Sequence, residues 1–106
     1  MTLVKVCSVA DVPDGEVTRV RVGDREIAIV NLGTDGFRAI DAVCSHAHYY
    51  LDEGDVDVED LTIECPKHGS TFDLDSGKPR SLPAIVPVQV FPVKVDDDDV
   101  LIEVET

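Results

Sequence analysis

Two short clusters of cysteine and histidine are the residues of this sequence best suited to chemistry. The clusters are Cys44-Ser45-His46 and Cys65-Pro66-Lys67-His68, so each contributes one thiol and one imidazole. Eighteen residues lie between them, from position 47 to position 64. Thiolates and neutral imidazoles are common protein ligands of zinc and of iron-sulfur clusters. The types and spacing of these residues therefore predict a metal site.

The mixed composition of each cluster bears on the choice of metal. Zinc fingers commonly group cysteine with cysteine and histidine with histidine, whereas here each cluster holds one of each. This arrangement suits a binuclear [2Fe-2S] site, in which Cys44 and Cys65 bind one iron and His46 and His68 bind the other. A second interpretation stays open, in which the same residues bind one zinc tetrahedrally and the protein is a zinc-stabilised, non-redox interaction module.

Strands are the elements that must position these clusters. Apolar and polar residues alternate over 17–22 and 26–30, and turn signals at 13–15, 23–24 and 33–36 separate the runs. This pattern predicts an antiparallel meander through about Val43. Residues 86–95 and 100–104 are expected to form a final hairpin with four aspartates, 96–99, at its tip, and Pro92 marks an edge strand. The predicted fold class is all-β.

The length and charge of the chain limit the number of domains and the kinds of partner that it can have. A chain of 106 residues fits a single domain, 1–106. Because 22 acidic residues face 9 basic ones, giving a formal net charge of -13, nucleic acid is not an expected partner. No stretch reaches transmembrane length and no secretory signal is visible, so no membrane partner is expected. Three cysteines cannot all pair, which favours a reducing compartment, the cytoplasm.

Nearly the whole chain resembles the Rieske ferredoxin family. Beyond the C-x-H and C-x-x-H spacing, the resemblance rests on the stretches 51–54, 69–73, 76–78 and 90–95. It implies a Rieske-like three-sheet sandwich of antiparallel sheets, with a small cluster-binding subdomain at about residues 43–83. It also implies one [2Fe-2S] cluster per chain, held by Cys44, His46, Cys65 and His68. A proline-containing loop at 79–83 is expected to shield the cluster.

Departures from the high-potential members of this family predict a low reduction potential. Those proteins carry an extra cysteine in each ligand loop, joined as a disulfide, but here Tyr49 or a neighbour and Lys67 stand at these positions. A tyrosine that donates to a cluster sulfur in those proteins corresponds to Phe72, which has no donor, while Ser70 is retained. Hydrogen bonds to the sulfurs raise the potential, so the loss of one lowers it.

Two further residues resemble ligands in type and receive other roles. The family spacing selects His46 over His48, so His48 is expected at the surface, with a contribution to docking or protonation as the alternative. Cys7 lies on the first strand pattern and is expected to be a small buried apolar side chain. Asp41 and Asp73 flank the ligand loops and are given no catalytic role.

The resemblance implies an electron carrier rather than an enzyme. Small ferredoxins of this type pass electrons from a flavin-dependent ferredoxin reductase to a terminal non-haem iron oxygenase of a ring-hydroxylating dioxygenase system. The chain is too short to be the oxygenase, which also needs a mononuclear iron site. Similar sequences also accompany iron-sulfur cluster assembly machinery, so assembly proteins are the alternative partners.

Overall fold

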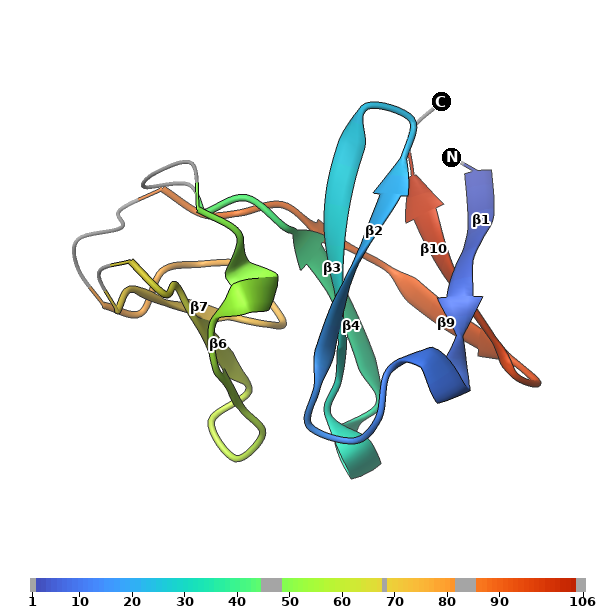
Figure 1. Ribbon diagram of the computed structural model, residues 1–106, viewed down its shortest axis with the longest axis horizontal. Coiled ribbons are helices and arrows are strands. Elements are labelled where there is room, and N and C mark those ends of the chain that lie inside the picture. The colour runs from blue at the N-terminus through green and yellow to red at the C-terminus, as the bar shows by residue number, and fades with distance from the viewer. Residues whose placement is uncertain (1, 45–48, 68, 82–85, 105–106) are drawn as a thin grey trace.

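The computed structural model describes residues 2–44, 49–67, 69–81 and 86–104, and it confirms an all-β fold (Figure 1). The strands are β1 (Thr2–Ser8), β2 (Val17–Val22), β3 (Arg25–Asn31), β4 (Phe37–Asp41), β5 (Val56–Asp57), β6 (Thr62–Glu64), β7 (Thr71–Asp73), β8 (Val90–Phe91), β9 (Val93–Asp96) and β10 (Asp99–Val104). Three short 3-10 helices, η1 (Val9–Asp11), η2 (Gly33–Asp35) and η3 (Leu51–Glu53), lie between them in the described residues. No helix in these ranges is long and apolar enough to cross a membrane.

Within the described residues the strands form three antiparallel sheets. Their strand orders are β1-β10-β9, β2-β3-β4-β8 and β5-β6-β7. The four-stranded sheet lies between the other two, as Figure 1 shows. The expectation of three antiparallel sheets is therefore confirmed.

The middle sheet carries an apolar core on each face because the side chains of its central strand alternate between faces. On one face, Ile27 and Ile29 of β3 pack in an outer cluster with Val100 and Ile102 of β10. On the other face, an inner cluster joins the middle sheet to the small third sheet. The inner cluster contains Ala28, Val30, Leu32, Ile40, Ala42, Cys44, Leu51, Ile63, Cys65, Phe72, Leu74 and Val88. Both predicted cysteine ligands therefore lie in the core beneath the third sheet.

The meander predicted from the alternating pattern is confirmed. β2 pairs with β3 from Val17 opposite Val30 to Val22 opposite Arg25, across a two-residue turn at Gly23-Asp24. β3 in turn pairs with β4. The meander ends at Asp41, two residues before the expected limit. The last strand of the meander, β4, ends three residues before Cys44, the first predicted ligand.

The final hairpin was predicted only in part. Residues 86–89 form no strand, and the chain changes sheets at Pro92: β8 pairs with β4 in the middle sheet, whereas β9 pairs with β10. Proline has no backbone N–H with which to continue a ladder. Both β8 and β9 are the last strands of their sheets, so Pro92 does mark edges. Asp96 pairs with Asp99, which leaves only two of the four aspartates at the tip.

Candidate metal centre

The two cysteines predicted as ligands begin two loops and are both buried. Cys44 follows β4 by three residues and is 3% exposed, whereas Cys65 directly follows β6 and is 1% exposed. Both belong to the inner cluster. The structure thus brings together two residues that are far apart in the sequence. His46, His48 and His68 lie outside the described residues, so their predicted roles stay predictions.

The first ligand loop, residues 44–54, is closed at its base by backbone hydrogen bonds. The N–H of Cys44 donates to the carbonyl of Tyr49 at 2.8 Å, and the N–H of Leu51 donates to Ala42 at 2.6 Å. Val43 and Tyr50 form an isolated antiparallel bridge at the same point. The chain therefore returns beside its own entry. These hydrogen bonds fix the chain at Cys44, before the segment that contains His46, and again at Tyr49 to Leu51, after that segment.

The second ligand loop, residues 65–70, is closed in a similar way. The N–H of Cys65 donates to the carbonyl of Ser70 at 2.7 Å, and the N–H of Gly69 donates back to the carbonyl of Cys65 at 3.1 Å. Gly69 has a φ of +75°, which glycine adopts without a steric penalty. Two short loops, each opened by a buried cysteine and each closed at its base, therefore face the same core.

The exit of the first loop packs directly on the entry to the second. A Cβ atom added to Gly54 would lie 1.7 Å from the carbonyl oxygen of Glu64, the residue before Cys65. The N–H of Glu64 donates to the carbonyl of Asp55 at 2.8 Å. Across the two loops, Nζ of Lys67 lies 5.3 Å from the centre of the Tyr49 ring. Neither contact was predicted, because each joins residues that are distant in sequence.

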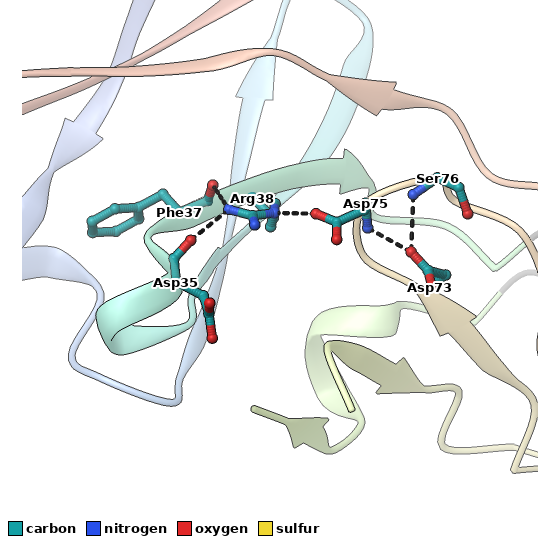
Figure 2. Close-up of polar contacts among 6 residues, drawn as sticks. All are labelled: Asp35, Phe37, Arg38, Asp73, Asp75 and Ser76. Atoms are coloured by element: carbon teal, nitrogen blue, oxygen red, sulfur yellow. Dashed lines mark hydrogen bonds and ion pairs between the residues drawn. The ribbon is translucent and has the colours of Figure 1, made fainter. Parts of the chain in front are cut away.

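A polar chain ties the turn after β7 to the middle sheet (Figure 2). Arg38 Nε donates to Asp75 Oδ1 at 2.6 Å, and Arg38 Nη1 donates to the carbonyls of Asp35 and Phe37. Asp73 Oδ1 accepts from the backbone N–H groups of Ser76 and Asp75, and the Ser76 bond is the main reason that the pKa of Asp73 is lowered.

The start of the loop predicted to shield the cluster pairs with β7. Pro79 forms a bridge with Phe72, and the N–H of Arg80 donates to the carbonyl of Thr71 at 2.7 Å. Residues 82–85 of the same loop lie outside the described residues. The Asp73 carboxylate stabilises the turn after β7, because it accepts from the N–H groups of Asp75 and Ser76.

A sequence profile described as the Rieske [2Fe-2S] domain matches residues 2–92. The chain belongs to this family. Ferredoxins are among the relatives that this Rieske chain matches over nearly its whole length. The ferredoxin component of biphenyl 2,3-dioxygenase from Rhodococcus jostii strain RHA1 is 41% identical over 105 residues, which cover 99% of this chain and 95% of the relative.

Two solved structures are also similar to this Rieske domain. The ferredoxin of carbazole 1,9a-dioxygenase from Nocardioides aromaticivorans IC177 is 37% identical with a TM-score of 0.90, over 96% of this chain and 97% of that chain. A ferredoxin from a complex of reduced oxygenase and oxidized ferredoxin in carbazole 1,9a-dioxygenase is 39% identical with a TM-score of 0.85, over 94% and 91% of the two chains.

The described residues fit the cofactor of the family. A Rieske domain holds one [2Fe-2S] cluster, which supplies reversible one-electron chemistry. Cys44 and Cys65 place two soft sulfur donors in an apolar core, where Leu51, Ile63 and Phe72 exclude water. The buried Ser70 lies in the second loop. The chain supplies the thiols and an environment of low polarity, both of which such a cluster needs.

Proposed function

We propose that this protein carries one electron at a time from a flavin-dependent ferredoxin reductase to a terminal non-haem iron oxygenase. The cluster is held by Cys44 and Cys65 on one iron and by His46 and His68 on the other. The protein acts as the electron-carrying component of a multicomponent oxygenase system and performs no catalysis alone. Residues 1–106 form a single domain, residues 43–83 form its cluster-binding subdomain, and the protein works in the cytoplasm.

One observation carries this proposal. Two loops of similar construction each begin with a buried cysteine, and both cysteines lie in the same inner cluster. Each loop also contains one of the predicted histidine ligands, at the C-x-H and C-x-x-H spacing. This arrangement supplies two sulfur and two nitrogen donors, which is the donor set of a Rieske cluster.

The similar proteins support an oxygenase as the partner. The Rhodococcus relative is a component of biphenyl 2,3-dioxygenase, and one similar ferredoxin was solved in complex with an oxygenase. The net charge of -13 favours a partner whose docking face is basic, because opposite charges raise the rate of encounter at low ionic strength. These observations favour an oxygenase over the iron-sulfur assembly machinery.

Electron delivery can be tested directly by rapid mixing. The reduced protein is mixed with an oxidised Rieske oxygenase of the biphenyl dioxygenase class, and the visible absorption of both clusters is followed. We expect fast reoxidation of the protein, at a rate that saturates with oxygenase and falls as salt is raised. Reoxidation by an assembly scaffold but not by any oxygenase of this class would contradict the proposed partner. The Cys65→Ser variant is the control without a normal cluster.

A further inference from the structure

A cation of the middle sheet lies against an aromatic ring of the first ligand loop. The Arg19 Cζ atom is 3.7 Å from the centre of the Tyr50 ring. This distance is well inside the range of a cation-π contact, and a planar guanidinium can stack on such a ring. Tyr50 itself packs against the inner cluster that contains both cysteines. Arg19 therefore contacts the loop that begins at Cys44 without belonging to it.

The same arginine faces a largely buried carboxylate of this loop. Arg19 Nη1 lies 3.9 Å from Asp52 Oδ1, and the Asp52 side chain is only 14% exposed. Within the described part of the chain this oxygen atom is buried and accepts no hydrogen bond. A buried carboxylate needs a compensating charge, and removal of that charge is strongly unfavourable. Among the described residues, Arg19 is the cation that lies within ion-pair distance of Asp52.

A second residue of the middle sheet fixes the other end of the tyrosine. The Glu26 carboxylate accepts a hydrogen bond from the Tyr50 hydroxyl, which raises the pKa of Tyr50. In the register of β2 and β3, Arg21 lies opposite Glu26 and Arg19 lies opposite Ala28. Because side chains two residues apart share a face, Arg19 and Glu26 project from the same face of the sheet. Arg19 of β2 thus contacts the ring of Tyr50, and Glu26 of β3 binds its hydroxyl.

The position of Tyr50 determines how the backbone of the ligand loop is held. Tyr50 pairs with Val43, and the preceding carbonyl, that of Tyr49, accepts the N–H of Cys44. A displacement of the tyrosine ring therefore acts directly on the hydrogen bond that fixes the first cysteine.

We propose that Arg19 is a positioning residue of the cluster site, which holds the first ligand loop on the middle sheet through Tyr50 and Asp52. By this contact Arg19 governs how firmly the cluster is retained. The inference rests on the proposed cluster ligands. The contacts of Arg19 can nevertheless be tested without the cluster, by the rate of backbone amide hydrogen exchange in the first ligand loop. Arg21 offers a matched control, since it is an arginine on the same face of the same strand and donates instead to the carbonyl of Gly23.

The test compares Arg19→Ala, Arg19→Lys and Arg21→Ala in the cluster-loaded protein. Amide hydrogen exchange is measured at Leu51 and Gly54, whose N–H groups donate to Ala42 and Leu51. Bleaching of the visible spectrum in excess iron chelator is measured on the same samples. We expect Arg19→Ala to accelerate both processes by about tenfold, the effect of losing a partly exposed cation-π contact together with the counter-charge of Asp52. Arg19→Lys retains the charge and changes both by about threefold, and Arg21→Ala changes neither by more than about twofold.

A double-mutant cycle separates the ring contact from a general loss of stability. In a Tyr50→Leu background, Arg19→Ala is expected to accelerate exchange at Leu51 by less than about threefold, because its main partner is already absent. Exchange at the central strand amides of Ile29 and Val30 is expected to stay unchanged in all single variants. Full additivity of the two substitutions, or an equal effect of Arg21→Ala, would overturn the proposal.

The outcomes also distinguish this inference from the proposed function. If the purified wild-type protein holds no iron-sulfur cluster, the proposed function fails, whereas the exchange measurement still tests the contact between Arg19 and the loop. If the cluster is present and the Arg19 variants retain it as wild type does, with unchanged exchange at Leu51, the positioning role is wrong and the electron-transfer function stands.

Discussion

The substitution Gly54→Ala tests whether the two ligand loops depend on their close contact. A Cβ atom at this position would lie 1.7 Å from the carbonyl oxygen of Glu64 and 2.9 Å from its carbonyl carbon. Contacts of a Cβ below 3.0 Å are essentially never seen, so the two segments must separate by at least 1.3 Å, the difference between 3.0 and 1.7 Å. Since Glu64 precedes Cys65, this separation moves the start of the second loop.

The expected cost can be estimated from the contacts. Gly54 has a φ of -95°, so alanine meets no backbone strain there and reduces the entropy of the unfolded chain, which stabilises by about 0.4–1 kcal/mol. Overpacking opposes this by about 1–3 kcal/mol, and weakening of the hydrogen bond from Glu64 to Asp55 adds about 1 kcal/mol. The net expectation is a loss of about 1–3.5 kcal/mol, concentrated at the junction of the two loops.

Gly23→Ala provides the control. Nothing lies within 4 Å of a Cβ at Gly23, but its φ of +62° imposes a conformational penalty of about 1 kcal/mol. Urea unfolding gives the free energy of unfolding, and the rate of iron release to a chelator reports on the site. We expect Gly54→Ala to release iron much faster than wild type, and Gly23→Ala to release it at the wild-type rate. Equal retention of iron by the two variants would refute the reasoning.

Three further outcomes follow from the sequence and the structure. The reduction potential should fall in the lower part of the Rieske range of about -150 to +300 mV, because Phe72 has no hydroxyl to donate to a cluster sulfur; protein-film voltammetry that gives a value near the upper end would contradict this. The pKa of Asp73 lies below 3.8, chiefly because the N–H of Ser76 donates to it. The ionised Asp73 carboxylate therefore stabilises the folded protein above pH 3.8, and this stabilisation is lost as the pH falls through the lowered pKa. The free energy of unfolding of wild type should therefore fall more than that of Asp73→Asn between about pH 5 and about pH 3. Burial, with a smaller effect from Asp11, raises the pKa of the half-buried Cys7 thiol, so its alkylation by iodoacetamide at neutral pH should be slower in the folded protein than in urea; equal rates would show that the thiol is not protected.

Local patterns in the sequence predicted the parts of the fold that depend on neighbouring residues. The alternation over 17–22 and the turn at Gly23-Asp24 define a hairpin whose partners are adjacent in the chain, and the structure has this hairpin. The pairing of β1 with β10 joins the two ends of the chain, and no local pattern specified it. The extent of the final hairpin was wrong for the same reason, since Val90 and Phe91 pair with a distant strand, β4.

In the candidate site, too, the sequence predicted residue types and local spacing but not the contacts between distant residues. Cys44 and Cys65 were identified by residue type and spacing, and the structure places both in one buried cluster. The contacts of Gly54 with Glu64 and of Arg19 with Tyr50 were not predicted. A glycine in a turn and an arginine on a strand are common in any sequence. Only the packing of the loops on the sheet gives these residues a specific role.

The central claim is that Cys44, His46, Cys65 and His68 hold one [2Fe-2S] cluster. The most direct test combines iron, zinc and sulfide analysis with low-temperature EPR of dithionite-reduced protein, on wild type and on His46→Ala and His48→Ala. We expect about two irons and two sulfides per chain with a Rieske signal in wild type and His48→Ala, and loss of that signal in His46→Ala. A colourless wild-type protein with one zinc and no sulfide, or loss of the cluster in His48→Ala alone, would contradict it.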